Sequence, residues 1–229
     1  FLICILIAVV VGAIAVFNMV RGIIKSAPDI KDIDATPTGY LSTVLDNNEN
    51  EIATLVASGS NRVYVTIDEI PKNLQHAFVA IEDERFYDHN GIDLQGILRA
   101  GVRGITHGFH FSEGASTITQ QLLKNNVFTG WTSESSFSDK LERKLQEQYL
   151  AVQLEKSVSK DWILENYLNS INLGQNTLGV QSASRRYFNK DVSELNISES
   201  AVIAAITQNP SRYNPVSYTH LTLPTSDLV

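Results

Sequence analysis

The stretch Glu82-Asp83-Glu84-Arg85-Phe86-Tyr87-Asp88-His89-Asn90-Gly91 closes a segment that opens at Pro71. Between these two points the apolar residues recur at helical spacing, at Leu74, Ala77, Phe78 and Ile81. Proline suits the first turn of a helix, and a glycine suits its end. The pattern therefore predicts a helix that begins at Pro71 and ends at Gly91, with a charged cluster in its last turns.

Glu82 is the candidate base in this cluster. It follows Phe78 by four residues and lies next to Ile81, so it borders the face that is expected to be buried. A carboxylate at such an edge loses hydration, which disfavours its charged form and makes it a better base. The alternative is a surface glutamate paired with Arg85, and the residues alone favour that alternative.

Composition sets the class of protein. Of 229 residues, 43% are hydrophobic, which is enough for one sizeable core. The 18 basic and 25 acidic residues give a net charge of −7, which argues against general binding of nucleic acid. An anionic ligand would therefore need a local basic cluster. The single cysteine, Cys4, excludes an intramolecular disulfide and a cysteine-rich metal site.

The first residues predict a membrane segment. Residues 1–20 are almost all apolar, with Asn18 the only strongly polar side chain and no charge before Arg21. About 20 apolar residues match a bilayer core of about 30 Å. A cleaved signal peptide is the alternative, but its apolar region is usually shorter. We expect residues 1–22 to be a transmembrane signal-anchor and, because the chain starts on Phe1, a cytoplasmic tail to precede it.

Residues 23–62 are expected to form a tether and a small β-element. Prolines and charges fill residues 26–39, whereas residues 40–45 and 51–56 flank the turn Asp46-Asn47-Asn48. Val63, Val65 and Ile67 alternate with polar residues, which predicts a half-buried strand at the start of a domain over residues 63–215. From Pro71 onward the periodicity is helical, so the predicted fold is mainly α with a small β lead-in.

A second chemical stretch runs from Glu113 to Asn125. The spacing Thr117-x-x-Gln120 is that of a capping box, so a helix is expected to begin there. Free N–H groups at a helix start suit a phosphate, and further donors are available from Ser116, Thr117, Gln120, Gln121 and Lys124. The spacing alone favours an ordinary capped helix. The flanking aromatic residues suit either the membrane interface or a small satellite core, and they are Phe109, Phe111, Phe128 and Trp131.

A third helix is expected over residues 139–156, opened by Asp139-x-x-Glu142. Its predicted buried stripe is Leu141, Leu145, Tyr149 and Val152. Arg143 and Lys144 precede Glu147 by four and three residues, so the three side chains project together. This spacing fits a solvated ladder of ion pairs, and it also fits a clamp for a diphosphate.

The rest of the chain predicts helices used for packing. Ser159 is expected to cap a helix over Lys160–Asn169, and a further helix carries Val180, Ala183 and Tyr187. The spacing Asn196-x-x-Glu199 is expected to cap a last apolar helix that stops at Pro210.

Five segments, in order, resemble the motifs of bacterial peptidoglycan glycosyltransferases, the lysozyme-like modules of class A penicillin-binding proteins. The first three segments are Glu82-Asp83 through Phe86, His89 and Gly91, then Gly114-x-Ser116-Thr117-Ile118-Thr119-Gln120-Gln121, then Arg143-Lys144-x-x-Glu147. The last two are Lys160-x-x-Ile163-Leu164-Glu165-x-Tyr167-Leu168-Asn169 and Arg186-Tyr187-Phe188 through Pro210-Ser211-x-Tyr213-Asn214-Pro215. The resemblance covers residues 63–215 and implies a lysozyme-like helical domain.

The resemblance also implies a reaction. Lipid II would be polymerised into β-1,4-linked glycan strands by an inverting single displacement, with Glu82 as general base and release of undecaprenyl pyrophosphate. Glu147 would be the second catalytic residue, orienting the diphosphate directly or through a divalent cation, Mg²⁺ or Mn²⁺; no other cofactor is implied. The implied substrate-binding residues are Asp83, Ser116, Thr117, Gln120, Gln121, Lys124, Arg143 and Lys144, with a partly structural role for Asp83 and His89.

The same resemblance implies a place in the cell. The chain would be a single-pass protein of the bacterial cell membrane, with its catalytic domain on the extracytoplasmic side. Its partners would be lipid II, the growing glycan strand and other cell-wall synthesis proteins.

Two features depart from the family pattern. Ala115 stands where the family often has a second glycine, and residues 216–229 resemble translated vector sequence rather than the family. Two other functions stay open, a lysozyme-like enzyme that cleaves glycan and an inactive membrane-tethered scaffold. Arg143 and Lys144 argue against the first because they suit a diphosphate leaving group, and the intact Glu82 and Glu147 argue against the second.

Overall fold

A computed structural model describes residues 2–55, 61–106, 114–128, 130–213 and 215. The helices are α1 Leu2–Ser26, α2 Lys72–Glu82, α3 Leu94–Thr106, α4 Ile118–Asn126, α5 Phe137–Leu154, α6 Lys160–Ser170, α7 Val180–Phe188, α8 Ile197–Ile206 and α9 Pro210–Tyr213. Short 3₁₀ turns η1 Ile30–Asp32, η2 Trp131–Ser133 and η3 Val192–Glu194 join them, and β1 Ser42–Leu45 pairs with β2 Glu51–Leu55. The predicted mainly α class with a small β lead-in is confirmed.

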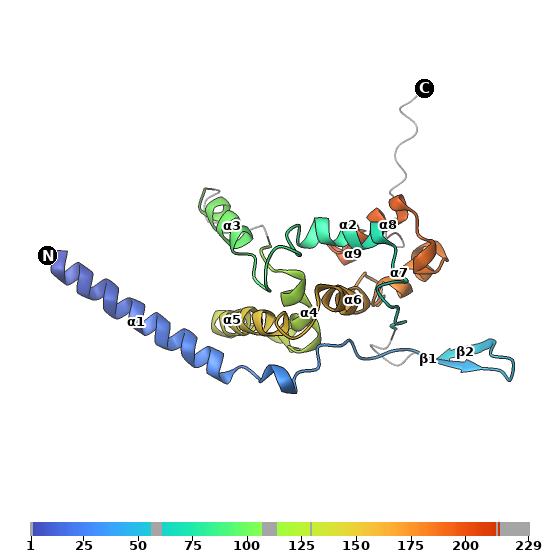
Figure 1. Ribbon diagram of the computed structural model, residues 1–229, viewed down its shortest axis with the longest axis horizontal. Helices are drawn as coiled ribbons and strands as arrows, with labels where there is room; N and C mark the ends of the chain where they lie inside the picture. Colours follow the sequence, from blue (N-terminus) through green and yellow to red (C-terminus); the bar gives the residue numbers. More distant parts are fainter. Residues whose placement is uncertain (1, 56–60, 107–113, 129, 214, 216–229) are drawn as a thin grey trace, which may run out of the picture.

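The core lies among α2 and α4 to α8 (Figure 1). Helix α4 packs against both α5 and α6, and α2 packs against α8. The rings of Phe78 on α2 and Tyr167 on α6 meet edge to face, with centroids 6.1 Å apart. Each fully buried apolar side chain of this size stabilises the fold by about 1.5–3 kcal/mol. The helices that carry the chemical motifs are thus fixed by one shared core.

Helix α1 leaves this body as a single rod (Figure 1) and contains no buried residue. Its most apolar stretch of 18 residues has a mean hydropathy of 2.9, and the helix is long and apolar enough to cross a membrane. The helix continues to Ser26 rather than ending near residue 22, so the anchor runs directly into the residues that were expected to be a tether.

The predicted tether is wrong between residues 30 and 35, because this segment is packed onto the body. The side chains of Ile30 and Ile33 pack against the core, and Ala35 is only 3% exposed. The Asn126 side chain on α4 donates to the Ala35 carbonyl over 2.8 Å. The sequence did not predict this packing, because the segment is rich in prolines and charged residues. Only a few apolar residues in it contact the core.

The β-hairpin forms as predicted, but the predicted strand over Val63, Val65 and Ile67 does not. Antiparallel β1 and β2 are joined by a turn in which the Asp46 carboxylate accepts from the amides of Asn48 and Asn50. The Val65 amide and carbonyl instead bond the Asn169 side chain, at 3.0 and 2.8 Å. A side-chain amide on α6 therefore takes the place of a neighbouring strand.

Helix α2 ends at Glu82 and not at Gly91. Asp83 leaves the helical conformation with φ −160°, and its carboxylate accepts a hydrogen bond from the Ile118 amide over 3.0 Å. Asp83 thereby occupies the N-terminus of α4, where a carboxylate is favoured by the helix dipole. The predicted helix end was wrong because this partner lies 35 residues further along the chain.

The local helix caps were predicted well, except at α5. Thr117, Ser159 and Asn196 cap α4, α6 and α8 as expected, and Asn196 forms the full capping box with Glu199. Helix α5 is capped by Ser136 instead of opening at Asp139. Its predicted buried stripe is also wrong, since the buried residues are Gln146, Glu147, Leu150, Ala151 and Leu154. A charged residue, Glu147, sits on the buried face because two cations neutralise it.

Candidate active site

A cavity of about 530 Å³ opens beside the end of α2. Its charged lining consists of Glu82 from α2, Arg99 and Arg103 from α3, and Lys124 from α4. Ser116 and Gln121 also line it, as do Thr207 and Gln208 beyond α8. A smaller cavity of about 130 Å³ adjoins it and shares Glu82, Arg99 and Ser116. Segments distant in sequence therefore converge on Glu82.

Glu82 is half-buried and held by a residue from another helix. The Gln121 side chain donates to Glu82 Oε2 over 2.8 Å. No described residue donates a hydrogen bond to Oε1 of the same carboxylate. The alternative pairing with Arg85 is wrong, because that guanidinium bonds Glu84 and Asp93, each at 2.5 Å. One oxygen of Glu82 is thus fixed and the other is available to accept a proton.

Asp83 and His89 form the support behind Glu82. Both Asp83 oxygens lie 3.0 Å from His89 Nε2, and both side chains are almost fully buried. The Gly91 amide donates to His89 Nδ1 over 3.2 Å, so the ring proton lies on Nε2 and is donated to Asp83. This chain of bonds fixes the backbone next to Glu82, which agrees with the structural part of the role expected for Asp83 and His89.

Gly91 ties the first motif to the second. Its φ of +89° favours glycine, and a Cβ there would lie 2.6 Å from the Ala151 carbonyl group. The Gly91 carbonyl accepts from Thr117 Oγ1 at 2.9 Å and from Gln120 Nε2 at 3.3 Å. The loop after Glu82 is therefore clamped between α4 and α5.

These contacts argue against four assignments made from the sequence. Asp83, Thr117 and Gln120 were expected to bind substrate, but their side chains are buried and engaged with the protein. The N-terminus of α4 was expected to suit a phosphate, but Asp83 already occupies it. Asp83 and Thr117 border the smaller cavity of about 130 Å³, but their polar atoms are already bonded within the protein, so their surroundings support structural tasks.

The charged group on α5 consists of Arg143, Lys144 and Glu147. It is neither an exposed row of ion pairs nor an open binding site for a diphosphate. Glu147 has no exposed surface, and its oxygens accept from Arg143 and, over 2.9 Å, from Lys144. Arg143 is 14% exposed and also bonds Glu134 at 2.9 Å. Lys144 is 38% exposed, and its ammonium donates to Ser116 Oγ over 2.7 Å. Lys144 is therefore the member of the group that reaches the cavity lining.

This arrangement corrects the role predicted for Glu147. A carboxylate without exposed surface cannot orient a diphosphate by direct contact, because both cations stand between it and solvent. Glu147 instead positions Lys144 and Arg143. Arg143 is likewise held by two carboxylates and is less available to a ligand than the sequence predicted.

Lys124 adds a second ammonium to the site. Burial lowers the pKa of Lys124; the nearby Glu147 and Glu82 raise this pKa, whereas Lys144 and Arg143 lower it. The ammonium also lies 4.7 Å from the centre of the Trp131 ring. Lys124 thus stands within electrostatic reach of both the candidate base and the charged group on α5.

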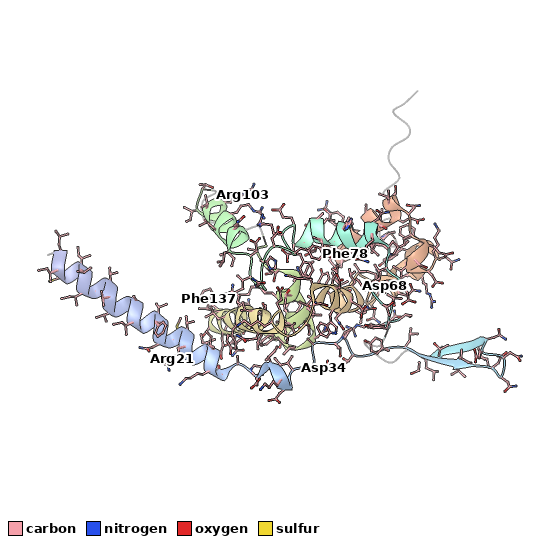
Figure 2. All side chains as sticks on the ribbon, viewed as in Figure 1. Arg21, Asp34, Asp68, Phe78, Arg103 and Phe137 are labelled. Atoms are coloured by element: carbon pink, nitrogen blue, oxygen red, sulfur yellow. The ribbon has the colours of Figure 1, made fainter. Side chains whose placement is uncertain are left out.

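Arg99 and Arg103 were missed by the sequence analysis. They lie four residues apart on α3 and line the cavity together with Lys124 of α4. Figure 2 labels Arg103 on the outer part of α3. Arg99 also bonds Glu84 at 2.7 Å. The signal that could have found them is the four-residue spacing of two cations on a helix whose other face is apolar.

The aromatic residues around α4 do not form the expected membrane patch where the structure describes them. Phe128 packs against the core, and Trp131 covers Lys124. Phe109 and Phe111 lie outside the described residues. A row of exposed apolar side chains lies instead on α3, at Leu94, Leu98, Val102 and Ile105.

The described residues offer no set of three ligands for a resident metal ion. Within the described ranges no group of three or more His, Cys, Asp or Glu side chains could hold one. Both oxygens of Glu147 already accept bonds from cations. The divalent cation expected beside the diphosphate stays a prediction, and no chemical step is derived through it.

Comparison with known proteins agrees with the family that the motifs resemble. A family model described as Transglycosylase matches residues 48–228. Penicillin-binding protein 1A of Clostridium acetobutylicum is 45% identical over 210 residues, covering 90% of this chain and 26% of that protein. Penicillin-binding protein 1A of Clostridium perfringens (strain 13 / Type A) is 43% identical over 201 residues, covering 86% and 28%. Penicillin-binding protein 1F of Bacillus subtilis is 46% identical over 175 residues, covering 76% and 23%.

The chain spans about a quarter of the length of these curated relatives. Together with the helical fold, the family match confirms the predicted lysozyme-like class. The matched range includes residues 216–228, which were expected to lie outside the domain and which fall outside the described residues.

Proposed function

The chain belongs to the transglycosylase family, and we propose from this premise that it polymerises lipid II into β-1,4-linked glycan strands. The observation that carries the proposal is the composition of the cavity, where one carboxylate, Glu82, faces three basic residues, Arg99, Arg103 and Lys124. In a chain with a net charge of −7, this is a local positive site beside a base. Such a site suits the transfer of a sugar from an anionic leaving group.

Glu82 acts as the general base in the proposed reaction. Its open oxygen takes the proton of the acceptor 4-hydroxyl as that oxygen attacks the anomeric carbon of the donor. A new C–O bond forms on one face of the sugar, and the bond to the pyrophosphate breaks on the other with its electron pair. The configuration at the anomeric carbon is inverted. Gln121 keeps the base in place through its bond to the other carboxylate oxygen.

The cations stabilise the departing pyrophosphate. Lys124 lines the cavity, and Lys144 reaches it through Ser116. Donors that are already oriented toward a developing charge lower the barrier without reorganising. Glu147 and Arg143 hold Lys144 from behind, so their effect on the reaction is exerted through Lys144.

A glycan-cleaving enzyme is less well supported. Inverting and retaining hydrolases place two carboxyl groups on either side of the scissile bond. Here the second candidate carboxylate, Glu147, is fully buried beneath two cations and cannot protonate a leaving sugar oxygen. The cations also suit a diphosphate better than a neutral sugar.

The proposed setting is the bacterial cell membrane. Helix α1 would cross it once, leaving the catalytic domain on the extracytoplasmic side, where lipid II and the growing strand are met. The exposed apolar face of α3, which includes Leu98 and Val102, would lie in the membrane interface beside the cavity. Other cell-wall synthesis proteins are the proposed protein partners.

The direct test is to incubate the purified chain with labelled lipid II in detergent micelles, with Mg²⁺, with Mn²⁺ and with a chelator. The expected product is a ladder of glycan strands that lysozyme digests, with released undecaprenyl pyrophosphate. The absence of polymer under every condition, or cleavage of pre-formed glycan instead, would contradict the proposal.

A further inference from the structure

The end of the membrane helix is hydrogen-bonded to the helix that carries the charged group. Gln146 Nε2 on α5 donates to Ser26 Oγ over 3.1 Å and to the Ile23 carbonyl over 3.4 Å. Ser26 Oγ also lies 3.3 Å from Glu142 Oε1. Gln146 is a buried polar residue with 9% exposure, and its amide needs hydrogen-bond partners. Two of them, Ser26 and Ile23, lie on α1, and a third, Glu142 at 3.5 Å, lies on α5 itself. The contact joins residues 120 positions apart in the chain.

The chain after α1 is fixed to the body as well. Asp29 caps η1 by accepting from the Lys31 amide at 3.0 Å, and this turn lies against α5. Ile30 and Ile33 then pack on the core, and the Ala35 carbonyl is bound by Asn126. Only residues 27–29 separate the helix from this packed segment. The anchor is therefore held at two places and has little freedom to swivel.

The position of the contact along α1 coincides with the expected membrane surface. The apolar side chains from Leu2 to Met19 are exposed, and the first charges are Arg21 and Lys25. Figure 2 labels Arg21 on the part of α1 that is close to the body. Basic residues at the end of a spanning helix extend toward the lipid headgroups. Lys144 and Glu147 lie within one turn of Gln146, a distance of about 5 Å along a helix. The charged group on α5 is thus placed at the depth of the headgroups.

We propose that the last turn of α1 and residues 27–35 form a brace that holds α5 at the headgroup level of the membrane, with Ser26 and Gln146 as its positioning residues. The inference rests on the proposed function, because the ligand to be met at that level is the diphosphate of a membrane lipid. The brace places the Lys144 ammonium, which reaches the cavity lining, at the same depth as the diphosphate of the substrate. The lipid tail of the substrate sets that depth in the membrane. It acts through the orientation of the domain and not through contact with the substrate.

The test uses the full chain in lipid nanodiscs. A fluorophore is attached to Lys140→Cys, an exposed site on α5, in a Cys4→Ser background, and it is quenched by lipids spin-labelled either at the headgroup or deep in the acyl chain. The parent is expected to show strong headgroup quenching. The Ser26→Ala/Gln146→Leu variant is expected to lose at least half of it as the domain swivels. Gln153→Leu is the matched control, because its side chain on α5 bonds no described residue.

Kinetics in two environments complete the test. For lipid II in nanodiscs, the KM of the double variant is expected to rise about fivefold, the effect of losing about one hydrogen bond, with kcat within about twofold. In detergent micelles, where no flat surface fixes the depth, KM should equal that of the parent. The KM of the milder Ser26→Ala variant, altered at an exposed position, should also rise in nanodiscs. This single variant keeps the test valid if the double variant misfolds.

Two failures can be told apart. If the parent makes no polymer in either environment, the proposed function fails, and the quenching data still decide whether the brace exists. If the parent polymerises lipid II while the double variant keeps the parent's quenching, or keeps its KM in nanodiscs, the brace is overturned.

Discussion

Gln121 Nε2 lies 2.8 Å from Glu82 Oε2, so the carboxylate at the end of α2 is held by a side chain from α4. The two residues are 39 positions apart and belong to different motifs. The bond leaves the second oxygen of Glu82 without a donor among the described residues. Orientation of the base is therefore a property of the packed helices and not of α2 alone.

Replacing Gln121 with leucine keeps the size of the side chain but removes this bond. A hydrogen bond to a charged group is worth about 1.5–3 kcal/mol, so we expect kcat to fall about 10- to 100-fold. Steady-state polymerisation of lipid II measures the effect, with Gln148→Leu on α5 as the control. A kcat within twofold of the parent would show that Gln121 does not orient the base.

Lys144→Ala should weaken binding of the donor and stabilisation of its leaving group together, because both depend on the same charge. We expect a lower kcat with a raised KM, and a donor affinity that falls less steeply with salt than in the parent. Lys140→Ala, at an exposed site on the same helix, controls for a general loss of charge. If Lys144→Ala keeps the donor affinity of the parent and the same dependence of that affinity on salt, the charged group on α5 has a purely structural role.

The pH dependence of kcat/KM for the lipid II donor should reflect the loss of the positive charge on Lys124. Burial lowers the pKa of this lysine, so its positive charge is lost at a lower pH than that of an exposed lysine. We expect kcat/KM, which reports the free enzyme, to fall as the pH rises toward the alkaline range. Lys124→Arg keeps its charge and should move this decline to higher pH. The same alkaline profile in both proteins would mean that Lys124 is not the group that titrates.

The sequence predicted local features well and long-range ones poorly. The caps at Thr117, Ser159 and Asn196 were foreseen because a cap bonds amides of its own first turn. The end of α2 and the missing strand at Val65 were not foreseen, since their partners Ile118 and Asn169 lie far along the chain.

The candidate site was predicted in part for the same reason. Glu82, Ser116, Gln121, Lys124 and Lys144 are all brought to the cavity or its edge. The burial of Glu147 was missed because spacing alone places a charged residue at the surface. Arg99 and Arg103 were missed because no local pattern places α3 beside α2.

A form lacking residues 1–22 should still bind membranes through α3. Leu98 and Val102 are 70% and 53% exposed on this helix, and an apolar helix face of this kind partitions into the interface. We expect the truncated form to float with phosphatidylglycerol vesicles, and Leu98→Asp/Val102→Asp to abolish flotation. Ile197→Asp, at an exposed site on α8, is the control. Equal flotation of the double variant and the control would place the membrane-binding surface elsewhere.

The most direct test of the account is the rate of polymerisation by Glu82→Gln. Glutamine keeps the shape of the side chain but cannot take a proton. Loss of one general base costs about 10²–10⁴-fold, so we expect kcat to fall by this factor while the affinity for lipid II and the melting temperature stay close to those of the parent. A Glu82→Gln protein that polymerises lipid II at near the parent rate would contradict the assignment of Glu82 as the base.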